Sequence, residues 1–531
     1  MSHRVLLTDS LHPVCYELLA EAGLEAVDGS GWDAATITSQ CSTFDAWIIR
    51  SGTTITEDWI NRATRLTTIG RAGVGVDNVD LKAATKRGIV VLNAPAGNTL
   101  STAEHTMALM MSVMRSVPAA VASMKAGEWN RKAFMGSELF GKTLGIVGLG
   151  KIGKEVAVRA AAFGMDVVAS DPMMTTEGAD RLGIELVDVD TLLERSHVIT
   201  VHTPLVASTK HLLNDESLSR CKPGVVIVNC ARGGIVDEAA LLRALESGQV
   251  GGAAMDVYSA EPPPAALQAL VEHPRVVCTP HIAASTEEAQ EKVARQVTEQ
   301  VIRALTGEPV LTAVNAMAVR LASQVDVQPY LGLTERLGHA AGQLVPGRCA
   351  RLKVRCHGDI PRKYIDVMRV STLKGFLQTG WTEPVNLVNA SVIAEEAGIA
   401  VDMETFHAET SHSNLIELQI ETDAGSFRMA GSLFGDGHGR IVSVDGYALE
   451  LRMSGRMICY RNQDRPGMLA AVGTLLAAEN INIGSMSLGR HRPGEEALTV
   501  IAVDQPIPEA VLQAVAELDG VHRVGMLEFV S

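Results

Sequence analysis

The chain has 531 residues, which is enough for three or four domains that each bury a core of their own. Its 47% hydrophobic and 20% charged residues are typical of a globular protein. The sequence contains no run of about 18 apolar residues, so no membrane span is predicted. The formal net charge of −15 argues against nucleic-acid binding through bulk electrostatics, so an anionic substrate would need a local group of cations.

The eight cysteines are scattered, without a CxxC pair or the spacing of metal ligands. We therefore expect reduced thiols and no metal site. The first ten residues, MSHRVLLTDS, contain an acid and lack the apolar region of a secretory signal. Together these features predict a cytoplasmic protein.

Residues 3–97 alternate strand and helix patterns, with strands expected at 46–50 and 66–71 among others. Arg50 and Arg71 stand at the carboxyl ends of these two strands. Ligands of open parallel sheets lie beyond such ends, so we predict that the two arginines bind an anion. The alternative is a pair of surface arginines whose side chains are solvated.

An apolar helical pattern covers residues 98–116, with Asn98 or Ser101 as its N-cap. This helix is expected to connect the first domain to the next one. The segment that follows contains Arg131 and Lys132, which taken alone favour a solvated loop.

A glycine-rich unit follows at residues 141–172, GKTLGIVGLGKIGKEVAVRAAAFGMDVVASDP. Two apolar strand patterns flank a helix expected at 154–163, and Gly148, Gly150 and Gly153 are spaced as GxGxxG. The first glycine permits a tight turn, the second lets the backbone approach a pyrophosphate, and the third lets the helix pack closely on the sheet. The free amides at the helix start can hold the diphosphate, so this unit predicts dinucleotide binding.

Asp171 lies 18 residues after Gly153, directly behind the second strand pattern. At this position a carboxylate accepts hydrogen bonds from the ribose hydroxyls of the adenosine. The same carboxylate would repel a 2′-phosphate, so we predict NAD rather than NADP as the cofactor.

Further strands are expected at 198–202, 225–229, 252–257 and 276–279. Arg232, Glu261 and His281 follow the last three of these strands in turn. Hydride transfer from a 2-hydroxy acid needs a cation for the carboxylate and carbonyl, a group that takes the hydroxyl proton, and a carboxylate that orients that group. Each of the three residues has a structural explanation alone, but the set downstream of a dinucleotide unit predicts a dehydrogenase.

Several motifs resemble the D-isomer-specific 2-hydroxyacid dehydrogenases: GLGKIG, NCARGGIVDEAAL, the Glu261-Pro262 step and PHIAAST. Within that family, RAGVGVDNVDLKAAT, the length and the C-terminal region are similar to the long-form branch that acts on a phosphorylated hydroxy acid. The resemblance implies an α/β fold with two flavodoxin- or Rossmann-like doubly wound domains, the first split in sequence. An α+β intervening domain and a ferredoxin-like ACT domain would follow. The implied domains are 1–97 plus 283–315 for substrate binding, 98–282 for NAD, 316–453 for the intervening domain and 454–531 for the ACT domain.

The resemblance also implies the roles of individual residues. Arg232 would bind the substrate, His281 would be the acid/base and Glu261 its partner. Val74 departs from relatives that often carry Thr, so a side-chain hydrogen bond is lost there. The implied cofactor-binding residues are Gly148, Gly150, Lys151, Ile152, Gly153, Asp171, Thr203, Pro204, Cys230, Ala231, Arg232, Asp256 and His281. The implied substrate-binding residues are Arg50, Ser51, Arg71, Gly73, Val74, Gly75, Asn98, Arg131 and Lys132.

The last two segments carry no catalytic cluster. Residues 316–453 would form a regulatory domain or a structural spacer. Residues 455–531 read as β-α-β-β-α-β, and DRPGML followed by NINI resembles an ACT domain, a module that binds small amino acids at a dimer interface. The implied effector residues are Asn462, Asp464 and Asn482, with L-serine as the expected ligand. The alternative is a dimerisation module that binds nothing.

We therefore expect NAD-dependent oxidation of D-3-phosphoglycerate to 3-phosphohydroxypyruvate, the first step of phosphorylated L-serine biosynthesis. The resemblance also implies a homotetramer or a higher assembly. A first alternative is an unphosphorylated D-2-hydroxy acid such as glycerate or lactate, although an uncharged tail would not need Arg50 and Arg71. A second alternative is an NAD(H)-sensing regulatory scaffold, against which the intact set of Arg232, Glu261 and His281 argues.

Overall fold

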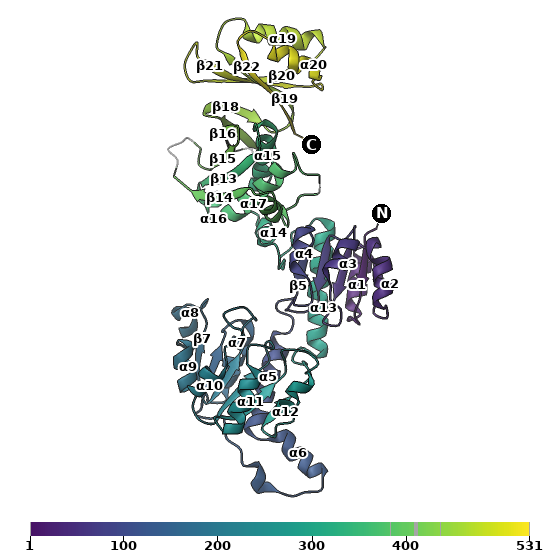
Figure 1. The fold of residues 1–531 in the computed structure, drawn as a ribbon, viewed down its shortest axis with the longest axis vertical. Coiled ribbons are helices and arrows are strands. Elements are labelled where there is room, and N and C mark those ends of the chain that lie inside the picture. The colour runs from purple at the N-terminus through teal and green to yellow at the C-terminus, as the bar shows by residue number, and fades with distance from the viewer. Residues whose placement is uncertain (1, 383, 408–411, 436, 530–531) are drawn as a thin grey trace. The chain divides into compact units, whose positions relative to one another are not determined.

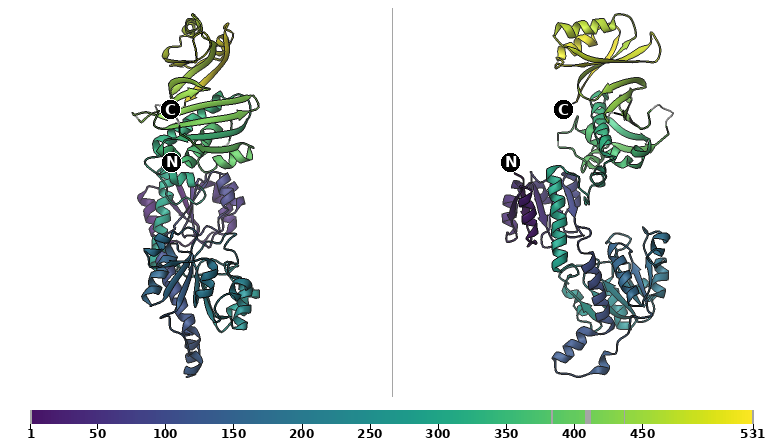
Figure 2. Two further views of the ribbon diagram at one scale, coloured as in Figure 1. Left: turned by 90° about the vertical axis from the view of Figure 1, so that its left-hand side faces the viewer. Right: turned by 180° about the vertical axis from the view of Figure 1, so that it is seen from behind.

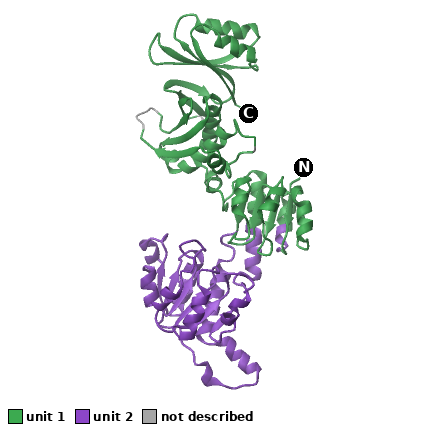
Figure 3. Ribbon diagram, in the orientation of Figure 1, with its two compact units in different colours: residues 1–10, 16–93, 297–531 green, residues 11–15, 94–296 purple. Residues whose placement is uncertain are grey.

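The computed structural model describes residues 2–382, 384–407, 412–435 and 437–529 (Figure 1). Contacts divide the chain into two compact units, one of residues 1–10, 16–93 and 297–531 and one of residues 11–15 and 94–296 (Figure 3). The described residues contain four separate sheets, and each sheet falls within one of the four expected domains. The domain boundaries themselves stay a prediction.

The first unit begins with a parallel sheet of five strands in the order β2-β1-β3-β4-β5. The strands are β1 (Arg4–Leu7), β2 (Glu25–Asp28), β3 (Ala46–Ile49), β4 (Thr68–Arg71) and β5 (Val90–Asn93), and the helices are α1 (Val14–Glu21), α2 (Ala34–Gln40), α3 (Glu57–Arg62), α4 (Leu81–Lys86) and α13 (Glu287–Thr306). Of α1 and α13, the residues from 16 and from 297 onward belong to this unit. All four residues of β3 are buried, as a continuous apolar strand in a parallel sheet should be. Helix α13 runs beside the sheet (Figure 2), and a Cβ at Gly70 of β4 would lie only 2.6 Å from Val301 of that helix. Glycine therefore permits this close packing.

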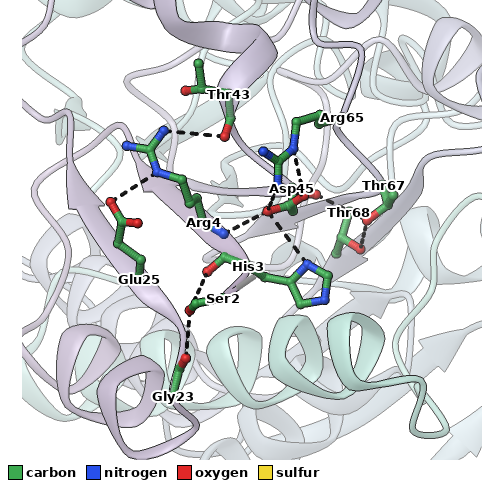
Figure 4. Close-up of polar contacts among 10 residues, drawn as sticks. All are labelled: Ser2, His3, Arg4, Gly23, Glu25, Thr43, Asp45, Arg65, Thr67 and Thr68. Carbon is green, nitrogen blue, oxygen red and sulfur yellow. Dashed lines mark hydrogen bonds and ion pairs between the residues drawn. The ribbon is translucent and has the colours of Figure 1, made fainter.

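The amino edge of this sheet is held by the carboxylate of Asp45, directly before β3 (Figure 4). Asp45 accepts hydrogen bonds from the Arg4 amide (2.8 Å) and from the Arg65 guanidinium (2.8 and 3.0 Å). Burial raises the pKa of Asp45, but these hydrogen bonds and the charge of Arg65 outweigh it, so the pKa lies below its ordinary value. This network lies at the opposite end of the strands from Arg50 and Arg71, which leaves the carboxyl edge for a ligand.

The second unit contains a parallel sheet of seven strands in the order β12-β11-β10-β9-β6-β7-β8. The strands are β6 (Thr143–Val147), β7 (Asp166–Ser170), β8 (Glu185–Leu186), β9 (Val198–Val201), β10 (Val225–Asn229), β11 (Val250–Met255) and β12 (Val276–Cys278). The helices are α5 (Thr99–Met114), α6 (Val117–Lys125), α7 (Lys151–Ala162), α8 (Thr176–Asp180), α9 (Val189–Arg195), α10 (Asp215–Ser219), α11 (Glu238–Ser247) and α12 (Gln268–Val271). Two hydrophobic clusters cover the two faces of the sheet, and the strand order reverses at β6. The predicted doubly wound fold is therefore confirmed, with its switch point between β6 and β9.

The intervening segment forms a mixed sheet of six strands in the order β14-β13-β15-β16-β17-β18. The strands are β13 (Cys349–His357), β14 (Ala400–Thr405), β15 (Leu415–Thr422), β16 (Gly425–Leu433), β17 (Gly439–Val444) and β18 (Tyr447–Arg452). The helices are α14 (Met317–Ala322), α15 (Gln328–Leu344), α16 (Asp359–Lys363), α17 (Ile365–Leu377) and α18 (Ala390–Glu396). Helices α15 and α17 touch backbone to backbone, because a Cβ at Gly375 would lie 1.9 Å from the carbonyl oxygen of Glu335.

The C-terminal segment is an antiparallel sheet in the order β20-β21-β19-β22 with two helices. Its elements are β19 (Gly455–Gln463), α19 (Met468–Ala478), β20 (Ile483–Arg490), β21 (Glu496–Val503), α20 (Glu509–Ala516) and β22 (Val521–Phe529). This confirms the predicted β-α-β-β-α-β order and the ferredoxin-like topology. One face of the sheet shares a hydrophobic cluster with the helices α19 and α20, and the other shares a cluster with the intervening segment.

Among the described residues, no single helix has the length and apolar character needed to cross a membrane, although the bent pair α5 and α6 meets that test when taken together. The same residues contain no group of three or more acidic, histidine or cysteine side chains that could hold a metal ion.

Candidate active site

The glycine fingerprint forms the turn between β6 and α7. Gly148 has a φ of +95°, and a Cβ there would lie 2.6 Å from the carbonyl oxygen of His202. Helix α7 begins at Lys151, directly after Gly150, so the expected start at Lys154 was wrong by three residues. Gly153 therefore lies in the first turn of the helix, where a Cβ would be 2.1 Å from the carbonyl oxygen of Gly148. At both Gly148 and Gly153 a carbonyl oxygen lies where a Cβ would stand, so the turn requires glycine at these two positions.

The start of α7 fits a dinucleotide. No side chain within the described structure caps the first amides of the helix, and a Cβ at Gly150 would meet no atom within 4 Å. Free amides beside open space form the usual site for a pyrophosphate. The buried atoms Thr203 Oγ1 and Asn98 Oδ1 also have no hydrogen-bond partner among the described residues, so both have hydrogen-bonding capacity left for a ligand. Asn98 stands at the N-cap position of α5, as the sequence predicted, but its side chain accepts no hydrogen bond from the first amides of that helix.

Asp171 stands one residue beyond β7 and is tied to the fingerprint. Its Oδ2 accepts a hydrogen bond from the Leu149 amide (2.7 Å), and its Oδ1 accepts one from the Met173 amide (2.7 Å). The carboxylate is thereby fixed beside the glycine turn at the carboxyl edge of the sheet. Lys151 directs its Nζ to the carbonyl oxygen of Pro95 (3.3 Å). The roles of both residues toward NAD stay predictions.

Arg232, Glu261 and His281 follow β10, β11 and β12, which are neighbours in the sheet. Glu261 Oε2 and His281 Nδ1 are 2.7 Å apart. A carboxylate can only accept, so Nδ1 carries the proton and Nε2 is left for the substrate. The side chains of Glu261 and His281 are 38% and 45% exposed, as an acid/base pair that must meet a ligand requires.

The loop before Glu261 orients its carboxylate. The amide of Tyr258 donates to Glu261 Oε1 (3.1 Å), and the Tyr258 hydroxyl donates to the carbonyl oxygens of Met255 (3.1 Å) and Thr279 (3.2 Å). One tyrosine thus connects the loop of Glu261 to the strand end that carries His281. Both oxygens of Glu261 are held, and its position relative to His281 is fixed by backbone contacts.

Asp256 anchors the loop of His281. This fully buried carboxylate accepts hydrogen bonds from the Thr279 hydroxyl (2.5 Å) and from the amides of Ile282 and Ala283 (2.9 Å each), on both sides of His281. Burial raises the pKa of Asp256, but hydrogen bonds from His105, Thr279 and the two amides outweigh it and the pKa is lowered. The expected role of Asp256 at the nicotinamide stays a prediction beside this observed anchoring.

The remaining expected cofactor residues lie around the same strand ends. Cys230 follows β10 and is buried, which raises the pKa of its thiol to about 12, so the thiol is neutral at physiological pH. The Arg232 Nη1 atom donates to the carbonyl oxygen of Ala231 (2.6 Å), and Asn229 holds the carbonyl oxygen of Arg232 through its Nδ2 (2.9 Å).

The expected phosphate-binding arginines are neighbours at the carboxyl edge of the first sheet, where Arg71 pairs with Ile49, the residue before Arg50. The Arg50 amide donates to Asp9 Oδ2 (2.7 Å). The Arg71 guanidinium folds over Gly73, because its Nη1 lies 1.3 Å from the place where a Cβ of that residue would stand. Gly73 therefore leaves room for the arginine, and the two cations share one edge.

The other expected substrate residues divide between the units. Ser51, Val74 and Gly75 belong to the first unit, where Asn93 Nδ2 donates to the carbonyl oxygen of Val74 (2.7 Å). Arg131 and Lys132 belong to the second unit, where they form a short 3-10 helix with exposed side chains instead of the expected loop.

The three expected effector residues have separate partners. Asp464 Oδ2 accepts hydrogen bonds from Arg490 Nη1 (2.7 Å) and from the Gly494 amide (3.2 Å), and these lower its pKa. Asn482 Nδ2 donates to Asp504 (2.7 Å). The side chain of Asn462 points into the domain, where its Oδ1 accepts a hydrogen bond from the Thr499 hydroxyl (3.2 Å). Only 3% of this residue is exposed.

Sequence reasoning missed several residues that build these sites. Asn78 donates to the carbonyl oxygens of Arg50 (2.6 Å) and Thr53 (2.5 Å) and so fixes the turn after β3. Tyr258 and Glu238 fix the loop of Glu261. Glu238 stands inside the quoted motif NCARGGIVDEAAL and Asn78 inside the quoted motif RAGVGVDNVDLKAAT, so both motifs carried a signal, whereas the position of Tyr258 follows only from tertiary contacts.

Comparisons with known proteins match this architecture. The D-isomer specific 2-hydroxyacid dehydrogenase NAD binding domain matches residues 107–283, the D-3-phosphoglycerate dehydrogenase intervening domain matches 326–445, and the ACT domain matches 458–520. The chain is 40% identical to D-3-phosphoglycerate dehydrogenase of Bacillus subtilis over 99% of both chains, and 40% identical to that of Archaeoglobus fulgidus over 98% of both chains. A crystal structure of Aquifex aeolicus D-lactate dehydrogenase with NAD and lactic acid is 27% identical, with a TM-score of 0.53 over 58% of this chain and 96% of that chain. The chain belongs to the D-3-phosphoglycerate dehydrogenases, NAD-dependent enzymes of the D-isomer specific 2-hydroxyacid dehydrogenase family.

Proposed function

We propose that this chain oxidises D-3-phosphoglycerate at C2, with Arg232, Glu261 and His281 as its catalytic residues. The observation that carries this proposal is the 2.7 Å contact between Glu261 Oε2 and His281 Nδ1 at the ends of neighbouring strands. The three side chains supply a cation, a proton acceptor and an orienting carboxylate, which are the groups that oxidation of a 2-hydroxy acid needs.

The residues divide the reaction between them. His281 Nε2 takes the proton of the C2 hydroxyl, and Glu261 stabilises the imidazolium that results. Arg232 pairs with the substrate carboxylate and the C2 oxygen, where a guanidinium can form two parallel hydrogen bonds. NAD, when bound, supplies the acceptor for the hydride from C2. The products are 3-phosphohydroxypyruvate, NADH and a proton.

The substrate phosphate is assigned to the first unit. Arg50 and Arg71 sit side by side at the carboxyl edge of β3 and β4, and the chain as a whole is strongly acidic. A pair of cations at such an edge suits the charge of a phosphate, whereas the uncharged methyl end of lactate would form no ion pair with it. NADH formation from D-3-phosphoglycerate should therefore exceed that from D-glycerate and D-lactate, and comparable efficiency on all three would contradict the substrate assignment.

Replacing His281 tests the catalytic assignment. The variant His281→Ala loses the proton acceptor but none of the glycine contacts of the fingerprint, so kcat should fall by roughly 100-fold or more, which is a far larger loss than that in the affinity for NADH. Initial-rate kinetics at alkaline pH and a fluorescence titration with NADH measure the two quantities. Equal losses in both would mean that His281 only maintains the structure of the site.

We also propose that the C-terminal domain binds L-serine and lowers the rate of the dehydrogenase. Support comes from Asp464, whose carboxylate is kept ionised by Arg490 and the Gly494 amide and could accept from an ammonium group. The rate with millimolar L-serine should fall. In Asp464→Asn the serine concentration for half inhibition should rise at least roughly tenfold, because a hydrogen bond to a charged group is worth about 1.5–3 kcal/mol. An unchanged concentration would remove Asp464 from the site.

The assembly and the compartment are proposed as well. Large apolar side chains are exposed on α6 and in the segment after it: Val117, Val121, Met124, Trp129 and Met135. Such a patch suits burial against a second copy of the chain, so we propose a homo-oligomer, with the homotetramer as the expected form. The eight cysteines are free thiols, which suits the cytoplasm. The four domains are proposed with the boundaries given above.

A further inference from the structure

Glu238 is a buried carboxylate with no part in the proposed chemistry. It is the first residue of α11 and is 8% exposed. Its Oε1 accepts a hydrogen bond from the Ser259 amide (2.7 Å), and its Oε2 accepts one from the Ser259 hydroxyl (2.5 Å). Burying a carboxylate is costly unless such partners satisfy it, so both oxygens are committed to one residue of the neighbouring loop.

Helix capping does not account for this arrangement. Asp237 is the N-cap of α11, and its Oδ1 accepts from the amides of Ala239 and Ala240 (3.0 Å each). A second carboxylate at the helix start could interact with the helix dipole from the solvent. Glu238 instead turns inward and crosses to the loop that follows β11.

The bond from Glu238 to Ser259 joins the loops of two catalytic residues. The segment from β10 to α11 carries Arg232, and the segment after β11 carries Glu261. Their backbones also touch at Gly233, where a Cβ would lie 1.8 Å from the carbonyl oxygen of Tyr258. Two contacts thus fix one loop on the other, and Ser259 follows directly after Tyr258, whose amide holds Glu261 Oε1.

We infer that Glu238 is a positioning residue, which acts through Ser259 to hold the Glu261 carboxylate in register with Arg232 and against His281 Nδ1. This inference rests on the proposed catalytic roles of Glu261 and His281. It predicts a larger effect on kcat than on the affinity for the cofactor, because the fingerprint turn between β6 and α7 and Asp171, directly after β7, are built by other strands of the sheet. A displacement of about 1 Å at a catalytic group can cost roughly 100-fold in rate.

Three single variants separate positioning from general stability. Glu238→Ala removes both bonds to Ser259 and should lower kcat by roughly 10- to 100-fold with an unchanged KM for NAD. Glu238→Gln should restore most of the rate, since its carbonyl oxygen still accepts from the Ser259 amide and its amide group can donate to the Ser259 hydroxyl. Ser259→Ala keeps the backbone bond and should fall between them. Glu246 is an exposed glutamate in the same helix. The variant Glu246→Ala is therefore the matched control and should leave kcat unchanged.

A double variant provides the decisive measurement. If Glu238 acts through Glu261, adding Glu238→Ala to Glu261→Ala should lower kcat no further, with folding of each variant checked by circular dichroism and thermal unfolding. Multiplying losses, or a Glu238→Gln variant as slow as Glu238→Ala, would overturn the inference while leaving the proposed function standing. An unchanged kcat in Glu261→Ala alone would instead contradict the proposed function. Should Glu238→Ala fail to fold, Ser259→Ala combined with Glu261→Ala makes the same comparison.

Discussion

At the scale of single residues, Asp45 shows how one carboxylate couples stability to pH. Its lowered pKa means that the folded state holds the proton less tightly than the unfolded state does. The stabilisation is therefore present above the pKa of the unfolded chain, and it is lost as the pH falls through the lowered pKa of the folded state.

Replacing Asp45 by Asn should remove this effect. The variant keeps the shape of the side chain but loses the charge that binds Arg65. Its free energy of unfolding at pH 7 should be lower by about 2 kcal/mol, the usual worth of a hydrogen bond to a charged group. Urea unfolding at pH 7 and near pH 3 measures the difference, which should shrink in acid. An equal difference at both pH values would show that lost packing, not charge, is responsible.

Single residues also show where sequence reasoning reaches its limit. Arg232, Glu261 and His281 could be identified because each has the right chemistry directly after an apolar strand. Glu238 and Asn78 stand inside motifs that the sequence analysis quotes, but the motifs alone assign them no role, because a glutamate at a helix start and an asparagine in a loop usually face water. Only the tertiary contacts show that both side chains turn inward to hold backbone groups.

At the scale of elements, the turn between β6 and α7 offers two glycines with opposite surroundings. Gly153 faces the carbonyl oxygen of Gly148, which a Cβ would approach to 2.1 Å, whereas Gly150 faces open space. Gly153→Ala should therefore destabilise the fold as well as NAD binding. Gly150→Ala should leave the thermal midpoint close to that of the parent and weaken NAD binding alone, because its methyl group takes the place of a pyrophosphate.

Differential scanning fluorimetry and a titration with NADH compare the two variants directly. The expected outcome is a lowered midpoint for Gly153→Ala and a weakened Kd for both. If Gly150→Ala bound NADH as tightly as the parent, the diphosphate would not lie at the start of α7.

The elements themselves were largely predictable, since β10 was expected with the bounds it has, and β6, β7, β9, β11 and β12 were expected within two residues. The two-residue edge strand β8 was not expected. The start of α7 was placed too late because glycines at 150 and 153 have poor helix propensity, and the free amides there are left for a ligand rather than for packing. The apolar pattern of residues 361–379 predicts a single helix, whereas the structure ends α16 at Lys363 and begins α17 at Ile365. Tyr364 between them has a ψ of 31°, outside the helical range.

At the scale of the whole molecule, the C-terminal sheet is part of the core of its neighbour. Six of its side chains belong to the same hydrophobic cluster as the intervening segment: Met457, Cys459, Leu498, Val500, Leu527 and Phe529. Gln343 of α15 also bonds both backbone groups of Glu528, at 3.0 Å and 2.7 Å. The two segments therefore depend on each other more than two independent modules would.

A chain that ends at Met453 should accordingly fail to keep its intervening domain folded. Burial of one such side chain is worth about 1.5–3 kcal/mol, so losing several contacts removes an amount comparable to the whole stability of a domain, about 5–15 kcal/mol. Binding of a hydrophobic dye should rise, and the thermal transition of the intervening domain should fall or vanish. The fingerprint and the catalytic loops belong to the other compact unit, so NADH should still bind to the truncated chain. An unchanged thermal profile and no dye binding in the truncated chain would contradict this expectation. The sheet of β19 to β22 would then cover its neighbour without stabilising it, and the effect of a bound effector would have to reach the rest of the molecule by another route.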